Sequence, residues 1–227
     1  MNILEKKTFR LLLLGAVLSV IIIFTPTRDP HTVANPDPNH THADFAVWVL
    51  GKKLDFSDAH YMSGSSTDEH THDEEGEYLN QYLHLHDGNG HVLHGHKPGL
   101  TIGEYFASLG LPMTGNCFSL DEFQFSSLDS GIVASYALTR ELCTNGKFHW
   151  QMIVNGQERP FDPSYTFGDL DQILLLYQAG DTWDAEWKQM TDDACLYSKR
   201  CPWRGEPPTE NCIADPAVPC TVPEDEL

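Results

Sequence analysis

The chain has 227 residues, with 33 Asp or Glu against 14 Lys or Arg, so its formal net charge is -19. This charge excludes a nucleic-acid-binding protein, because a polyanion would be repelled rather than attracted. The length allows one sizeable hydrophobic core or two small ones.

The start of the chain has the pattern of a membrane tether. Lys6, Lys7 and Arg10 precede an apolar run without a charged residue, at 11–24. A basic segment followed by an apolar one is typical of secretory signals and signal anchors. The run is short for a full transmembrane helix, about 21 Å against a hydrocarbon core of about 30 Å. No small-x-small cleavage site follows it, so an uncleaved signal anchor is favoured over a cleaved signal peptide.

This interpretation predicts a single-pass protein of the cell membrane. Residues 1–10 would form a cytoplasmic basic segment, residues 11–25 a transmembrane signal anchor, and the rest of the chain would be extracytoplasmic. The Pro-rich segment at 26–39 has few apolar residues and predicts a stiff, extended spacer between the membrane and the domain that follows.

Two β-hairpins are predicted next along the chain. Residues 40–56 are rich in β-branched and aromatic side chains around a turn at Gly51-Lys52. Residues 58–77 are acidic and lack periodicity, which predicts a flexible loop. Residues 82–96 then alternate apolar and polar side chains on both sides of an Asp-Gly-Asn-Gly turn at 87–90, which is a strong hairpin signal.

A helix and two further strands follow the second hairpin. Apolar residues at helical spacing predict a helix at 101–109, with Thr101 as its N-cap and Gly110 as its stop. Strands are predicted at 148–154 and 172–177. The sequence therefore predicts an α+β fold for an extracytoplasmic, His-rich domain at 40–180.

The six cysteines all lie beyond the apolar run. An even number of cysteines outside the cytoplasm indicates structural disulfides, although sequence alone selects no connectivity. We expect residues 181–227 to form a Cys- and Pro-rich tail held by disulfides. Our pairing hypothesis joins Cys117 to Cys143, Cys195 to Cys201, and Cys212 to Cys220.

Part of the predicted domain resembles a known fold family. Val154-Asn155-Gly156 closes one strand, and the segment DLDQILL at 169–175 opens the last one. These residues are similar to the β-grasp (ubiquitin-like) fold of sulfur carriers, over about residues 98–178. The resemblance implies one mixed sheet with one main helix. Sulfur carriers end in Gly-Gly whereas this chain continues well beyond that point, so the resemblance does not imply sulfur transfer.

Histidine is the residue type that indicates a functional site. Eight of the 12 histidines occur in His-x-His pairs. Residues i and i+2 of a strand point to one face about 6.5–7 Å apart, so two imidazoles can converge on one cation. The pairs are His40/His42, His70/His72, His84/His86 and His94/His96. His70/His72, in the acidic loop, is a weaker candidate, for a mobile accessory or low-affinity capture site. The unpaired His31, His60, His91 and His149 are expected to be ordinary polar or satisfied histidines.

The register of the second hairpin decides whether its two pairs meet. A two-residue turn would place one pair on each face of the hairpin. A three-residue loop at 88–90, with a bulge at Gly90, places His84 directly across from His94 and gathers all four imidazoles on one face. The same register gathers the leucines on the other face, where their burial contributes about 1.5–3 kcal/mol each. We therefore favour the three-residue loop.

The first strand can add to this face. His40, His42 and Asp44 share a face by parity, so pairing of this strand beside the hairpin would bring six histidines together. Imidazole ligands suit Zn²⁺, Cu²⁺ or Ni²⁺, and one or two ions of zinc or copper would fit. Asp44 and Asp87 are the candidate acceptors that would orient ligand imidazoles. The alternative reading is that each pair lies on a solvated strand face. The candidate ligands are His40, His42, His84, His86, His94 and His96.

The ectodomain as a whole also resembles a family. The segments 40–56, 82–111 and 192–212, with their His-x-His pairs, the helix opening TIGEYF and the tail cysteines, are similar to an uncharacterised family of membrane-anchored, His-rich prokaryotic proteins. Some members carry the label protein-disulfide isomerase. Cys-x-x-Cys is absent from this sequence, so that activity is kept only as an alternative.

The leading functional hypothesis is a non-enzymatic ectodomain that captures or senses Zn²⁺ or Cu²⁺ at the membrane surface. One alternative is a metal-dependent hydrolase with Asp44 or Asp87 as the general base. A second is thiol-disulfide exchange at Cys195/Cys201, and a third is a purely structural surface module. The sequence indicates no particular protein partner.

Overall fold

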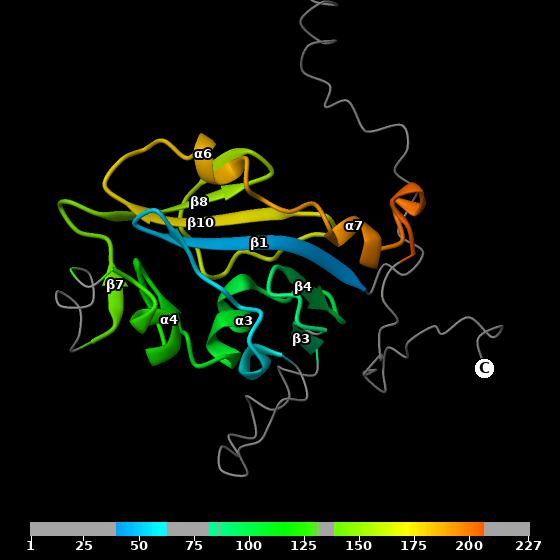
Figure 1. Ribbon diagram of the computed structural model, residues 1–227, viewed down its shortest axis with the longest axis horizontal. Coiled ribbons are helices and arrows are strands. Elements are labelled where there is room, and N and C mark those ends of the chain that lie inside the picture. Colours follow the sequence, from blue (N-terminus) through cyan, green and yellow to red (C-terminus); the bar gives the residue numbers. More distant parts are fainter. Residues whose placement is uncertain (1–39, 63–81, 86, 130, 132–138, 207–227) are drawn as a thin grey trace, which may run out of the picture. The chain divides into compact units, whose positions relative to one another are not determined.

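The structure is a computed structural model that describes residues 40–62, 82–85, 87–129, 131 and 139–206 (Figure 1). All of these belong to one unit, Ala34–Leu227. Within the described ranges no helix combines the length and the apolar character needed to cross a membrane. Several predicted features lie outside the described residues: the anchor, the spacer, most of the acidic loop, His31, His70, His72, His86, Cys212 and Cys220.

A mixed sheet organises the described unit and agrees with the predicted α+β class. At its centre β1 (Thr41–Val49) and β10 (Gln172–Gln178) lie side by side and parallel. β1 is buried from His42 to its end, as expected for a central strand that is covered on both faces. The order across the sheet is β3-β4-β1-β10-β8-β9, and β2 also pairs with β1.

The other strands of this sheet are antiparallel to their neighbours. On one side of the centre β1 pairs with β4, and β4 pairs with β3. On the other side β10 pairs with β8, and β8 with β9. The predicted strands at 148–154 and 172–177 are confirmed as β8 and β10. The bounds are Lys52–Lys53 for β2, Leu83–His84 for β3, Val92–Gly95 for β4, His149–Val154 for β8 and Gln157–Arg159 for β9.

One face of the sheet carries the main core under helix α3 (Ile102–Ser108). The helix begins as predicted: Thr101 accepts from the Glu104 N–H while the Glu104 side chain accepts from the Thr101 N–H, forming a capping box. Gly110 has a φ of 71°, which is consistent with its predicted role as the stop. Ile102, Tyr105 and Phe106 are buried in the main core, so the apolar face predicted for this helix is the face that packs on the sheet.

The opposite face is covered by the chain that follows β10. Trp183, Trp187 and Met190, around α6 (Asp184–Trp187), pack on a cluster that includes Trp48 of β1. Helix α7 (Ala194–Tyr197) contributes Ala194 and Tyr197 to a small cluster with Val92 of β4. Figure 1 shows α3 and α6 on opposite sides of the sheet.

A second, three-stranded sheet was not predicted from the sequence. Its strands β5 (Met113–Thr114), β6 (Cys117–Ser119) and β7 (Glu141–Cys143) are too short to give a periodic signal. Cys117 lies directly opposite Cys143 in this sheet, and the two form a disulfide. Cys195 and Cys201 form another. Both predicted pairings are therefore confirmed. A short helix α4 (Glu122–Ser126) follows β6.

Two predictions for residues 50–61 need correction. The first hairpin turns at Leu50-Gly51, one residue earlier than predicted, because both residues have positive φ and Lys52 already pairs with Val49. The predicted acidic loop begins with a 3-10 turn, η1 (Ala59–Tyr61), capped by the Asp58 side chain. A second such turn, η2 (Pro202–Arg204), lies near the end of the described chain.

The second hairpin has the predicted register but not the predicted bulge. His84 is paired with His94 and Leu83 with Gly95, as the three-residue loop requires. The left-handed residues are Asp87 and Gly88, with φ of 60° and 69°, so the bulge at Gly90 was wrong. Gly90 is needed for another reason: a Cβ there would lie 2.4 Å from the Ser57 nitrogen. The hairpin turn therefore packs directly on the backbone that follows β2.

Replacing Gly90 with alanine is expected to lower the free energy of unfolding by about 1–3 kcal/mol, because the new methyl group overlaps backbone atoms that cannot rotate away. The matched control is Gly146→Ala, since a Cβ at Gly146 meets nothing within 4 Å. Urea unfolding of both variants measures the difference. Equal midpoints for the two variants would contradict this packing.

Candidate metal centre

Five of the six predicted histidine ligands lie together on one face of the sheet. Register pairs His94 of β4 with both His42 of β1 and His84 of β3. His40 comes just before β1 and His96 just after β4, and the contacts described below join both to the same group. The name histidine cluster is used here for His40, His42, His84, His94 and His96.

The cluster is buried. His42 and His94 are 1% and 0% exposed, His84 and His96 are each 5% exposed, and His40 is partly buried. The leucines of the same hairpin point the other way, into the main core under α3, as predicted. The cluster face is covered by α7 instead. The hairpin leucines in the main core are Leu83, Leu85 and Leu93.

Ring nitrogens link three of the histidines in a row. His96 Nδ1 lies 2.7 Å from His40 Nε2, and His96 Nε2 lies 3.2 Å from His84 Nε2. A neutral imidazole carries one N–H, so His96 cannot donate from both nitrogens. If it donates from Nδ1 to His40, its Nε2 presents a lone pair toward His84 Nε2. A cation between these two Nε2 atoms would be bound by both.

The spacing of these two nitrogens suits a shared ion. Two nitrogen ligands at about 2.0–2.1 Å from a tetrahedral Zn²⁺ are about 3.3 Å apart. The observed 3.2 Å between His84 Nε2 and His96 Nε2 is close to this value. The shorter contact from His96 Nδ1 to His40 Nε2 is that of a hydrogen bond, and a hydrogen bond from the second ring nitrogen is what orients a ligand imidazole.

The other two rings of the cluster lie beside α7. The centroids of His42 and His94 are 4.8 Å apart, and the Tyr197 ring lies 4.7 Å from His94 and 5.8 Å from His42. His42 Nδ1 lies 2.8 Å from Ser198 Oγ in a buried contact. The segment around α7 therefore forms a wall of the histidine cluster.

Asp44 is on the predicted face, and its carboxylate contacts the tail. It accepts hydrogen bonds from Thr191 Oγ1 at 2.6 Å, the Asp193 nitrogen at 3.0 Å and the Ala194 nitrogen at 2.9 Å. Burial raises the pKa of the Asp44 carboxyl, and these three hydrogen bonds offset part of that increase. Asp87, the other predicted acceptor, is exposed in the hairpin turn. Asp44 thus anchors the segment that leads into α7.

A second group of possible ligand atoms lies nearby. Atoms of Asp44, His91 and Asp193 are all within 4.8 Å of one another. His91 Nε2 is 2.9 Å from Asp193 Oδ2, and Arg204 donates to the other Asp193 oxygen at 2.9 Å. Hydrogen-bond donors already engage both carboxylates, so this group is a hydrogen-bond network with one ion pair, between Arg204 and Asp193. His91 was predicted to be an ordinary polar residue, and this contact agrees with that.

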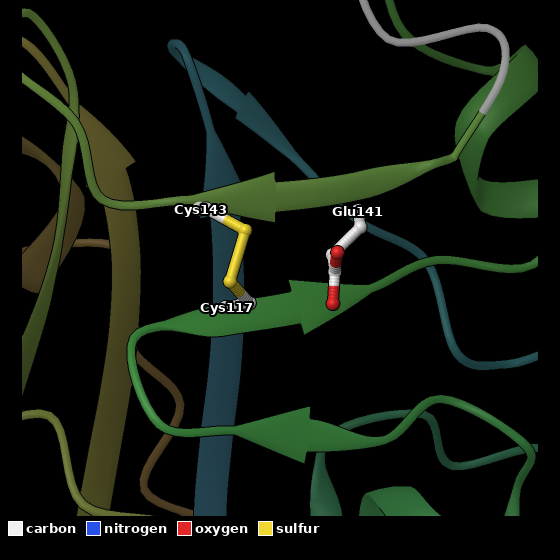
Figure 2. Close-up of side chains that lie close together, drawn as sticks. All are labelled: Cys117, Glu141 and Cys143. Carbon is white, nitrogen blue, oxygen red and sulfur yellow. A yellow bond between two sulfur atoms is a disulfide. The ribbon is translucent and has the colours of Figure 1, made fainter.

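The third group is a disulfide rather than a metal site. Ligand-type atoms of Cys117, Glu141 and Cys143 also lie within 4.8 Å of one another. Figure 2 shows the two sulfurs joined by a bond, with the Glu141 side chain beside them. Disulfide sulfurs are not thiolates, and thiolate is the form of cysteine that binds metal.

The sequence did not indicate which residues from the C-terminal part of the chain contact the histidine cluster. They are Asp169, which the sequence placed only at the start of the segment DLDQILL, and Tyr197 and Ser198 in the turn between two cysteines. The sequence predicted only that Cys195 and Cys201 pair within a tail held by disulfides. Nothing in the sequence indicated that this turn would lie against β1 and β4.

The described part of the chain is thus a mixed α+β domain with two disulfides and a buried cluster of imidazoles. Comparison with protein-family models, with curated proteins and with solved structures finds no match for the chain. Its function is therefore argued from the geometry of the site.

Proposed function

We propose that the protein is a metal-binding protein that holds Zn²⁺ or Cu²⁺ in the histidine cluster. The observation that carries the proposal is the gathering of five imidazoles along one face of three neighbouring strands, with two Nε2 atoms 3.2 Å apart. His86 is the sixth candidate ligand and lies outside the described residues.

Burial of the histidine cluster favours the binding of a cation. Polar groups that leave water need partners, and the cost of leaving them unsatisfied is high at low dielectric. One cation satisfies the lone pairs of several imidazoles at once, which a network of neutral rings does less completely because each ring has a single N–H. The acidic net charge of -19 also favours the approach of cations.

The donor set narrows the class of ion. Imidazole nitrogen suits Zn²⁺, Cu²⁺ and Ni²⁺, whereas Ca²⁺ and Mg²⁺ prefer oxygen. A tetrahedral zinc site uses four ligands, so the five rings of the histidine cluster are more than one ion requires. One or two ions therefore fit the proposal, with the remaining rings orienting the ligands as His40 orients His96.

We also propose that this domain is extracytoplasmic and tethered to the cell membrane by the apolar segment at 11–25. The two disulfides support an oxidising compartment, where such bonds persist. The β-grasp likeness is kept as a proposal as well. Parallel pairing of β1 with β10, flanked by the antiparallel strands β4 and β8, supports a mixed sheet of this kind, in which β1 and β4 precede the range 98–178.

Two other activities gain less support. Cys195 and Cys201 are 6% and 2% exposed, and thiol-disulfide exchange needs access to a sulfur atom. For a metal-dependent hydrolase, Asp44 or Asp87 would act as the general base. The oxygens of Asp44 already accept three hydrogen bonds from the tail, and Asp87 is exposed in the hairpin turn. Capture or sensing of a metal ion, without catalysis, remains the proposed role.

Titration of the purified full-length chain with Zn²⁺ and with Cu²⁺, against a competing chromophoric chelator, tests the proposal. The double variant His84→Ala/His94→Ala is expected to lower the affinity by more than about 100-fold, because it removes two ligands from adjacent strands. Elemental analysis of the protein purified without chelator identifies the ion that it retains.

The matched control is the double variant His60→Ala/His149→Ala. His60 and His149 each contact an aspartate away from the cluster, at 2.7 Å and 3.2 Å, so their loss should leave metal affinity unchanged. The proposal fails if the wild-type chain binds neither ion, or if the cluster variant binds as tightly as this control.

A further inference from the structure

We infer that Ser198 and Asp169 are positioning residues of the metal centre, which hold the His42 imidazole with its proton on Nδ1 and its lone pair on Nε2. The inference rests on the proposed function and deepens it. It assigns to the C-terminal segment a part in metal binding that none of the His-x-His pairs could supply.

The direction of the hydrogen bonds follows from the chemistry of the three groups. Arg200 Nη1 donates to Asp169 Oδ2 at 3.1 Å, and the other oxygen, Oδ1, accepts from the Ser198 hydroxyl. A serine hydroxyl has one proton, so Ser198 can only accept at its contact with His42 Nδ1. His42 must therefore be the donor there. Its proton is on Nδ1 and its lone pair is on Nε2, the nitrogen that a metal ion would use.

This arrangement fulfils the role that was predicted for Asp44. A ligand histidine commonly donates its second ring N–H to a carboxylate, directly or through an intermediary, and this fixes both the tautomer and the ring orientation. Asp169 also accepts from the His42 backbone nitrogen at 3.3 Å, and the Leu170 nitrogen donates to the His42 carbonyl at 2.7 Å. The main chain and the ring of His42 are thus held by the same short segment.

A disulfide-closed turn carries the other members of this arrangement. The Cys195–Cys201 bond encloses Tyr197, Ser198 and Arg200. Tyr197 packs on His42 and His94, Ser198 bonds to His42, and Arg200 bonds to Asp169. Ser198 is only 2% exposed, so bulk water cannot easily replace its hydroxyl.

The tautomer of His42 is directly measurable. Long-range 1H-15N correlation spectra of the full-length, metal-free chain should show His42 protonated at Nδ1. In Ser198→Ala the ring should become a mixture of tautomers, and Zn²⁺ affinity should fall by about 10- to 100-fold, as for other groups that orient a ligand. A ring protonated at Nε2 in the wild-type chain would overturn the inference.

The matched control for Ser198→Ala is Ser164→Ala. Ser164 also donates its hydroxyl to an aspartate, Asp162 Oδ1 at 2.7 Å, but both residues of this pair are exposed. It should leave Zn²⁺ affinity and the His42 spectrum unchanged. If Ser198→Ala and Ser164→Ala bind Zn²⁺ equally well, the inference is wrong.

A second pair of variants covers the case in which Ser198→Ala does not fold. Asp169→Asn keeps an acceptor oxygen for the serine proton, whereas Asp169→Ala does not. We expect the asparagine variant to retain the wild-type tautomer and most of the affinity that the alanine variant loses. Equal loss in both variants would contradict a positioning role. Failure of the wild-type chain to bind metal would instead reject the proposed function, and the His42 spectrum would still report on the hydrogen bonds.

Discussion

Replacement of Asp44 by alanine is expected to lower the free energy of unfolding by about 3–5 kcal/mol. The partly buried backbone N–H of Asp193 and the buried one of Ala194 would lose their acceptor, and each such loss costs about 1–3 kcal/mol. The Thr191 hydroxyl would lose its acceptor as well. Urea unfolding measures the change, and hydrogen exchange should show the loss of protection concentrated in the segment that leads into α7.

Asp162→Ala is the matched control for this prediction. The Asp162 carboxylate likewise accepts from a backbone nitrogen and a hydroxyl, both of Ser164, but it is exposed to water. Water can replace its role, so a much smaller change is expected. An equally small change for Asp44→Ala would show that the tail segment is held by other contacts.

Removal of the Cys117–Cys143 disulfide is expected to cost about 3–4 kcal/mol, with no effect on metal binding. The two cysteines are separated by 26 residues, and cross-linking a loop of that length restricts the unfolded chain by about this amount. The bond joins β6 and β7 of the three-stranded sheet, which contributes no residue to the histidine cluster. Urea unfolding and Zn²⁺ titration of Cys117→Ser/Cys143→Ser test both halves of the prediction.

The companion variant is Cys195→Ser/Cys201→Ser. Its loop spans only six residues, so the loss of stability should be smaller, about 2–3 kcal/mol. Metal affinity should fall in this variant, since the turn that it opens carries Ser198. The opposite pattern, with affinity lost only when Cys117 and Cys143 are replaced, would contradict the location of the site.

The elements that could be predicted from the sequence are those with a strong local signal. Alternation fixed the register of the second hairpin, because only one register puts Leu83, Leu85 and Leu93 in the core. The capping box marked the start of α3 in the same way. β5, β6 and β7 have two or three residues each, so they carry no periodicity that could be read.

Only those features of the site that follow from strand-face parity and hairpin register could be predicted from the sequence. Parity placed His42 and Asp44 on one face of β1, and the register placed His84 and His94 across from each other. The partners of His42 and Asp44 depend on the path of a segment about 150 residues further along the chain. Periodicity contains no information on that path. Asp169, Tyr197 and Ser198 therefore could not be assigned to the site from the sequence.

The parallel pairing of β1 with β10 has a consequence for how the protein is made. The first strand of the domain must wait for residues 172–178 to be synthesised before its central partner exists. Pairings between such distant residues form slowly, because a long loop must close before they contribute. During that interval the nascent chain exposes His42 together with the apolar residues of β1. Nascent chains should thus depend on protection from aggregation until β10 has been synthesised.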